Sequence, residues 1–93
     1  MKYRLVIPPF VARAISEFAP NLKGKICAAL EAICEDPHLG KPLRDELQGL
    51  RSYRVARYRI VYRIRHQRIE IQVIDVGPRG LIYERVIRII KNQ

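Results

Sequence analysis

The spacing of apolar residues in the first third of the chain predicts a strand followed by two helices. Residues 2–7 form a short β candidate, and Pro8 and Pro9 suit the first turn of a helix, where a missing N–H costs little. Apolar residues then recur at the spacing of one helix face, at Val11, Ala14, Ile15 and Phe18. After a Pro-Asn interruption, a second helix is expected over residues 21–35, with an inner face of Leu22, Ile26, Ala29, Leu30 and Ile33. These features predict an antiparallel helical hairpin.

After a connecting segment, the apolar residues recur at every second position, as in a β-strand. Residues 36–49 are rich in Pro, Gly and Asp and are interpreted as a loop, from which three leucines reach the core: Leu43, Leu47 and Leu50. Every second residue is then apolar, first at Tyr53 and Val55 and then at Tyr58, Ile60, Tyr62 and Ile64. The alternation shifts by one residue between Val55 and Tyr58, which fits a tight turn at Ala56 and Arg57. This pairing places Arg54 directly opposite Arg59 on the other face of the hairpin. Like charges opposite each other cost some tenths of a kcal/mol, so we interpret the two as an anion clamp.

The same reasoning applied to the next turn assigns residues 65–68 to a loop. Ile69, Ile71 and Val73 would then continue the buried face, and Arg63 would lie opposite Glu70 and be neutralised by it. Val73, Ile74 and Val76 form a nearly continuous apolar run. Such a run is typical of an inner strand that is covered on both faces of the sheet. Gly77 and Pro78 are expected to end it. A short C-terminal helix is predicted to bury Tyr83, Val86, Ile87 and Ile90, with Arg85, Arg88 and Lys91 outside.

These elements indicate an α+β fold with the order β-α-α-β-β-β-α. We expect a mainly antiparallel twisted sheet, packed against the N-terminal helical hairpin and the C-terminal helix, in a single domain over residues 1–93. No apolar run approaches the roughly 20 residues that a membrane-spanning helix needs. The first apolar run is short and broken by two prolines, which is unlike a signal peptide, and a cytoplasmic protein is therefore expected.

The charge of the chain points to an anionic partner. The net charge is +9, and 13 of the 18 basic residues are arginine. Seven arginines and no acidic residue occur between Arg51 and Arg68. Because the flat guanidinium group binds phosphate and carboxylate with paired hydrogen bonds, this bias favours recognition of either group over solubility alone. Nucleic acid is the first candidate partner, an acidic protein the second, and a solvated basic face remains an alternative.

Cysteine and histidine give no sign of a metal site. Cys27 and Cys34 are seven residues apart, so on one helix they are separated by about 10 Å, too far for a disulfide. We interpret both as small buried residues in a reducing compartment. His38 and His66 have no partner at the spacing of metal ligands, and no metal or other cofactor is expected.

The order of elements, together with two segments, resembles the RelE/ParE superfamily of toxins from type II toxin–antitoxin systems. The segments are YRVARYRIVY and VGPR, the latter followed four residues later by Tyr83, and the likeness extends over nearly the whole chain. The resemblance implies a metal-independent endoribonuclease that cuts mRNA in the ribosomal A site, where the 2′-hydroxyl of the RNA attacks. It also implies mRNA, rRNA and a cognate acidic antitoxin as partners.

The resemblance implies roles for individual residues in such an enzyme. Arg59 would contact the substrate phosphate, Arg79 would stabilise the transition state, and Tyr83 would orient or protonate around the cleaved nucleotide. Arg54 matches a basic residue of the first hairpin strand, and with Arg57 and Arg51 it is predicted to bind RNA. The family pattern has a lysine two residues after the first basic position, where this chain has Ala56. Arg57 could replace that lysine only if the turn redirects it.

Two other functions remain open from the sequence. ParE-type relatives share the fold and poison DNA gyrase without nuclease activity, although they usually lack the Arg and Tyr set found here. Ala56 keeps open a third possibility, a catalytically weakened toxin-like protein that acts within its antitoxin complex.

Overall fold

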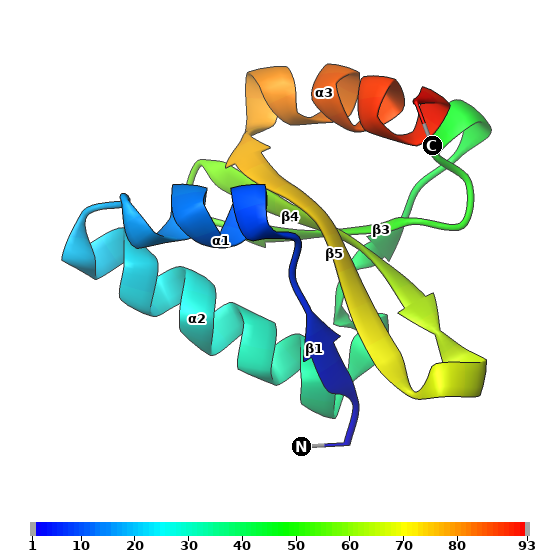
Figure 1. Ribbon diagram of the computed structural model, residues 1–93, viewed down its shortest axis with the longest axis horizontal. Coiled ribbons are helices and arrows are strands. Elements are labelled where there is room, and N and C mark those ends of the chain that lie inside the picture. The colour runs from blue at the N-terminus through cyan, green and yellow to red at the C-terminus, as the bar shows by residue number, and fades with distance from the viewer. Residues whose placement is uncertain (1, 93) are drawn as a thin grey trace.

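A computed structural model describes residues 2–92, and within them five strands form one sheet in the order β1-β5-β4-β3-β2 (Figure 1). The strands are β1 (Arg4–Val6), β2 (Lys41–Pro42), β3 (Arg51–Val55), β4 (Tyr58–Arg65) and β5 (Glu70–Pro78). The helices are α1 (Pro9–Ser16), α2 (Pro20–Glu35) and α3 (Arg79–Lys91), with short 3-10 turns at η1 (Pro37–Leu39), η2 (Asp45–Leu47) and η3 (His66–Arg68). The β1–β5 pair is parallel and the other pairs are antiparallel, so the predicted α+β fold is confirmed.

The helices cover opposite faces of the sheet (Figure 1). The α1–α2 hairpin packs on one face, where the larger core contains Val11, Ile15, Ile26, Leu30, Ile33, Ile60, Tyr62, Ile71 and Val73. Helix α3 packs on the other face over a smaller cluster of Leu50, Val61, Ile74, Ile82 and Val86. This two-sided burial explains the apolar run in β5, whose residues belong to both clusters. No helix within residues 2–92 is long and apolar enough to cross a membrane.

The register of the first hairpin agrees with the prediction. Val55 pairs with Tyr58, Tyr53 with Ile60, and Arg54 with Arg59. Ala56 in the turn has a φ of 53°, a left-handed conformation that lets two residues join the strands. The alternation of apolar residues was sufficient here, because the short turn allows only one pairing that keeps the apolar side chains on a single face.

The prediction for Arg63 was wrong. Arg63 lies opposite Gln72, whereas Glu70 lies opposite Arg65 and forms an ion pair with Arg4 of β1. The turn between β4 and β5 therefore begins one residue later than expected. Ile69, which was expected on the buried face, lies in this turn with a φ of 53° and is 55% exposed. A register that slides by two residues keeps the same side chains on the same face, so alternation alone cannot detect the slide.

Three smaller expectations also need correction. The segment 36–49 is not entirely loop, because it contains η1, η2 and β2, whose two residues pair with the edge of β3. Cys27 is exposed, whereas Cys34 is buried at the end of α2 beside β1, where the Tyr3 N–H donates to its carbonyl. Arg85 does not point outward from α3 but pairs with the buried Asp75 of β5. The end of β5 at Pro78 agrees with the prediction, and α3 begins directly at Arg79.

Candidate functional site

A hollow of about 560 Å³ lies between β2, β3 and the start of α3. It is lined by Leu39, Lys41, Pro42, Leu43, Ser52, Tyr53, Arg54, Arg59, Arg79 and Tyr83. A second hollow of about 360 Å³ shares three of these arginines and is lined by Arg54, Ala56, Arg57, Arg59, Pro78, Arg79 and Gly80. No acidic residue within residues 2–92 lines either hollow, so the two together form a positively charged concave surface.

Arg54 and Arg59 form the floor of this surface. They face each other across the β3–β4 hairpin, because both lie on the face of the sheet that carries α3. Their hydrogen bonds are long contacts to backbone carbonyls, from Arg54 Nε to Ala56 O and from Arg59 Nη1 to Tyr58 O, each 3.3 Å. Neither guanidinium has a carboxylate partner among residues 2–92, which leaves their donors available for an anion.

Arg79 enters the same surface from the first position of α3. Its backbone N–H donates to the carbonyl of Arg57 over 3.0 Å, which ties the start of the helix to the β3–β4 turn. Pro78 precedes the helix without a side-chain cap, and the first turn contains no acidic residue. The positive end of the helix dipole therefore adds to the field of the three arginines.

Tyr83 brings a hydroxyl group to the same hollow. One turn after Arg79, its Oη lies 3.0 Å from Ser52 Oγ of β3, and either hydroxyl can be the donor. The ring is half-buried, so the hydroxyl is held by the sheet while its remaining hydrogen-bonding capacity faces the hollow. The arrangement places a phenol beside three guanidinium groups.

Of the other two predicted RNA-binding residues, Arg57 and Arg51, only Arg57 lies at the site. Arg57 lines the second hollow, next to Ala56. Arg51 points to the opposite face of β3, where its Nε donates to the carbonyl of Gly40 over 2.9 Å, and it lines neither hollow. The structure thus gathers Arg54, Arg57, Arg59, Arg79 and Tyr83, and it separates Arg51 from them.

Three residues that line the hollow with an amine or a hydroxyl group were not identified as site residues from the sequence: Lys41, Ser52 and Tyr53, the last of which was assigned to the core. Lys41 lies on β2, a strand too short and too exposed to produce an alternating pattern. Ser52 is buried, and only the packing of α3 on β3, which brings Tyr83 to it, shows that it belongs to the site. Within residues 2–92 there is no group of three or more His, Cys, Asp or Glu side chains that could hold a metal ion. The hollow instead offers charge stabilisation by cations and a hydroxyl for proton transfer.

Comparisons with known proteins identify the relatives of this chain. Residues 6–83 match the family model described as ParE toxin of type II toxin-antitoxin system, parDE. Toxin RelE of Mycobacterium tuberculosis is 34% identical over 87 residues, an alignment that covers 87% of this chain and 86% of that protein.

Solved structures show the same fold. The toxin–antitoxin complex RelBE2 of M. tuberculosis contains a chain with a TM-score of 0.76 and 26% identity, covering 85% of this chain and 100% of that one. A mutant of the E. coli toxin RelE in the free state has a TM-score of 0.78 at 19% identity, covering 99% and 98% of the two chains. The match over most of the chain, in sequence and in fold, shows that this protein belongs to the RelE/ParE superfamily of toxins from type II toxin–antitoxin systems.

Proposed function

We propose that residues 1–93 act as one toxin domain that cuts mRNA on the ribosome in the cytoplasm and thereby inhibits translation. The observation that carries this proposal is the gathering of Arg54, Arg59, Arg79 and Tyr83 in one hollow without an acidic residue. Three guanidinium groups kept close together without counterions destabilise the fold, and an RNA phosphate would relieve their repulsion.

The proposed reaction is attack of an RNA 2′-hydroxyl on the adjacent phosphorus, without a metal ion. The 2′-hydroxyl passes its proton to a water molecule, the new O–P bond forms, and the bond to the 5′-oxygen of the next nucleotide breaks. The 5′-oxygen takes up a proton, which leaves a 2′,3′-cyclic phosphate and a 5′-hydroxyl. Arg59 and Arg79 stabilise the charge on the crowded phosphorane, because both reach the hollow from fixed backbone positions. Tyr83 orients the cleaved nucleotide or supplies the proton for the departing 5′-oxygen.

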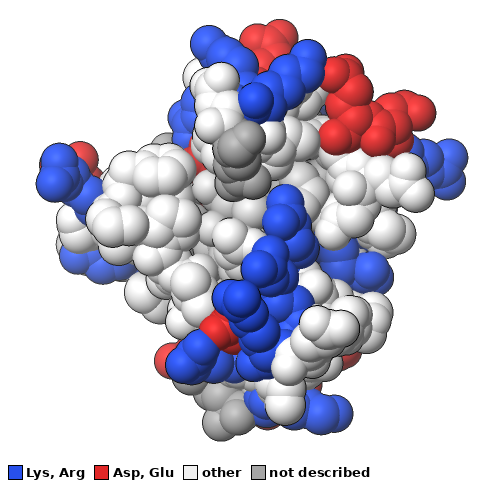
Figure 2. Space-filling view, turned by 45° about the vertical axis from the view of Figure 1, so that its right-hand side comes forward, with Lys and Arg blue, Asp and Glu red and all other residues white. Residues whose placement is uncertain are grey.

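The remaining arginines are proposed to steer the toxin to rRNA. Below α3, the open face of the sheet carries Arg4, Arg63 and Arg65, with Glu70 between the strands that hold them. Figure 2 shows basic side chains running as a column down this face. Arg63 has no carboxylate partner among residues 2–92, and Arg65 Nη1 contacts only the Gln72 amide oxygen, at 3.4 Å. Such a surface attracts nucleic acid in a salt-dependent manner.

A cognate antitoxin is the proposed inhibitor. The structural neighbours include toxin–antitoxin complexes from M. tuberculosis, E. coli and Pyrococcus horikoshii. A net charge of +9 on a chain of 93 residues favours an acidic partner that covers the basic surface.

Cleavage of mRNA on translating ribosomes tests the proposal, with the cut sites mapped by primer extension. We expect the free toxin to cut translated mRNA, and Arg79→Ala and Tyr83→Phe each to slow cleavage by at least about tenfold. Arg88→Ala is the matched control, since Arg88 is an exposed residue of α3 that lines neither hollow, and it should cleave like the wild type. Unchanged cleavage by both site variants would disprove the site assignment.

Inhibition of DNA gyrase is the second candidate function. It is favoured by the family model, whose description names the ParE toxin. A supercoiling assay with purified gyrase distinguishes the two functions. Gyrase inhibition with intact mRNA would select the gyrase function, whereas ribosome-dependent cleavage with unaffected gyrase would select the nuclease.

A further inference from the structure

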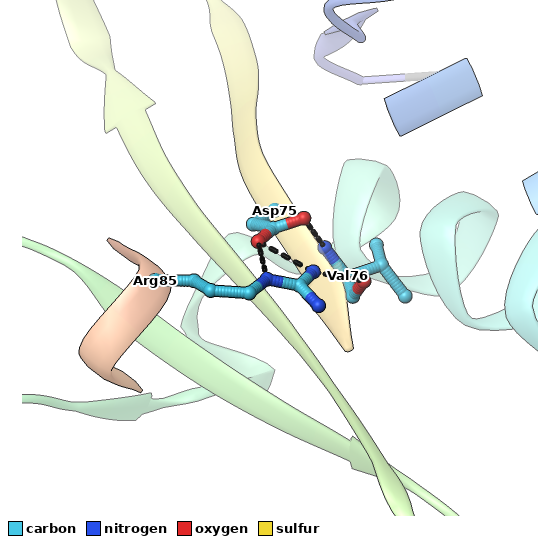
Figure 3. Close-up of polar contacts among 3 residues, drawn as sticks. All are labelled: Asp75, Val76 and Arg85. Carbon is cyan, nitrogen blue, oxygen red and sulfur yellow. Dashed lines mark hydrogen bonds and ion pairs between the residues drawn. The ribbon is translucent and has the colours of Figure 1, made fainter. Parts of the chain in front are cut away.

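Asp75, which is buried, and Arg85, whose side chain is 40% exposed, form an ion pair beneath α3, and no step proposed above uses it (Figure 3). Arg85 Nε and Nη2 both donate to Asp75 Oδ2, at 2.9 and 2.7 Å, and Nη2 also donates to the Val76 carbonyl at 3.2 Å. Asp75 Oδ1 accepts the Val76 N–H at 2.8 Å. The Asp75 side chain is only 4% exposed, so both of its oxygens are held in a fixed geometry.

The backbone of β5 is shaped to admit the Arg85 guanidinium. A Cβ atom at Gly77 would lie 2.9 Å from Arg85 Nη2 and 3.2 Å from its Cζ. Glycine therefore leaves room for the guanidinium to lie against the strand. Gly77 is also the residue of β5 that pairs with Arg59, so this contact lies directly beside the floor of the hollow.

The ion pair and Tyr83 hold the two sides of the same helix. Ser52, Val61 and Asp75 form one row across β3, β4 and β5. Tyr83 contacts Ser52 at one end of this row, Arg85 contacts Asp75 at the other end, and Ile82 and Val86 belong to the apolar cluster of Val61. Two residues along a helix correspond to a rotation of about 200°, so Tyr83 and Arg85 project from nearly opposite sides.

We propose that the Asp75–Arg85 pair is a positioning device that fixes the rotation of α3 about its own axis and thereby holds the Tyr83 hydroxyl in the hollow. Apolar contacts under the helix are non-directional and allow small rotations, whereas a guanidinium held by three hydrogen bonds does not. A rotation of about 10° moves a group about 6 Å from the axis by about 1 Å. Such a displacement of a reacting group can cost a factor of about 100 in rate.

The consequence for cleavage rests on the proposed nuclease function, but the position of Tyr83 can be measured without it. The test variant is Arg85→Lys, which keeps a positive charge beside Asp75 and removes the planar set of donors. The control is Lys91→Gln, which removes the other ion pair of α3, between Lys91 Nζ and Glu46 Oε2 at 3.5 Å. Both partners of that pair are mostly exposed, so it cannot restrict the rotation of the helix to the same extent.

Nuclear Overhauser effects in the free toxin report the position of Tyr83. We expect the effect between the Tyr83 ring and the Ser52 Hβ protons to be lost in Arg85→Lys and kept in Lys91→Gln. The buried Tyr62 ring, 0% exposed, serves as a reference for an intact core. If Arg85→Lys keeps both the core signals and the Tyr83–Ser52 effect, the proposal is wrong. If Arg85→Lys unfolds, the double variant Asp75→Asn/Arg85→Gln is measured in its place, because it leaves no unpaired charge at this position. Loss of the Tyr83–Ser52 effect with intact core signals supports the proposal, and retention of that effect shows that the proposal is wrong.

Single-turnover cleavage on programmed ribosomes then tests the consequence. With saturating toxin we expect Arg85→Lys to cleave at least about tenfold more slowly, with the half-saturating toxin concentration changed by less than about threefold. A changed half-saturating concentration with a normal rate would make Arg85 a binding residue and overturn the proposal. If the wild-type toxin does not cleave at all, the nuclease function fails, while the Overhauser measurement still decides on the positioning of Tyr83.

Discussion

At the scale of single residues, the hydroxyl of Tyr62 organises the segment that forms one wall of the hollow. It donates to the Pro37 carbonyl at 2.6 Å and accepts the Gly40 N–H at 2.9 Å. Gly40 lies between two residues that line the hollow, Leu39 and Lys41. A Cβ at position 40 would lie 2.6 Å from the Tyr62 oxygen, so glycine allows this close approach. A buried side chain on the helical-hairpin face thus shapes a site on the opposite face.

Replacing Tyr62 with phenylalanine should destabilise the protein and change its response to alkaline pH. The Pro37 carbonyl and Gly40 N–H would lose their partner, at a cost of about 1–3 kcal/mol in the free energy of unfolding. Burial raises the pKa of Tyr62 in the folded state, so the wild type loses stability as the pH rises from about 10 through that raised pKa. The Tyr62→Phe variant should lack this part of the alkaline loss. Urea unfolding at about pH 8 and about pH 11 measures both effects.

Tyr58→Phe is the matched control for this experiment. Tyr58 packs edge-to-face on Phe18, with ring centroids 5.1 Å apart, and its hydroxyl has no hydrogen-bond partner among residues 2–92. Its substitution should change stability by less than about 0.5 kcal/mol. Equal effects of the two substitutions would contradict a structural role for the Tyr62 hydroxyl.

At the scale of elements, the β3–β4 hairpin shows where function opposes stability. Its apolar face fills the core with Val55, Ile60 and Tyr62, whereas its other face places Arg54 opposite Arg59. None of α1, α2 and α3 begins with a side-chain cap or an acidic residue in its first turn. For α3, this leaves the positive end of the helix open toward the hollow. Both features cost stability and both favour the binding of an anion.

Arg54→Gln should therefore stabilise the protein while weakening RNA binding. Removing one of two opposed charges is expected to raise the free energy of unfolding by about 0.2–1 kcal/mol at low salt, and to lose one phosphate contact. Urea unfolding and titration of a fluorescent single-stranded RNA measure the two effects. Arg44→Gln, at an exposed position outside both hollows, should change neither by a comparable amount. A loss of stability in Arg54→Gln would mean that Arg54 has a structural role.

At the scale of the whole molecule, basic side chains form two surfaces on the α3 side of the sheet. One is the hollow at the start of α3, and the other is the column of Arg4, Arg63 and Arg65 on the open sheet. Two acidic residues on this side of the sheet are already paired, Glu70 with Arg4 and Asp75 with Arg85. A nucleic acid that enters the hollow therefore has further positive charge beside it.

The double variant Arg63→Gln/Arg65→Gln tests the steering role of the second surface. Each phosphate contact that is lost should reduce the slope of log K against log salt concentration by about 0.7 to 0.9, the values for single strands and for duplex DNA. We expect weaker and less salt-dependent binding to rRNA fragments, while cleavage at saturating toxin stays within about threefold of the wild type. Filter binding between about 50 and 200 mM salt measures the slope. An unchanged slope would remove this surface from RNA binding.

The amino-acid sequence by itself determined the faces of the elements and the chemistry available to the site. Alternation placed Arg54 opposite Arg59, and helical spacing identified the α1–α2 hairpin, because both patterns are local and repeat over several residues. The tertiary structure decided the register of β5, the pairing of Arg63 with Gln72 and the inward position of Arg85. These depend on how α3 and β1 pack on the sheet, and a slide of two residues or a rotation of a helix leaves the local pattern unchanged. The hollow exists only because that packing brings Arg79 and Tyr83 beside the hairpin.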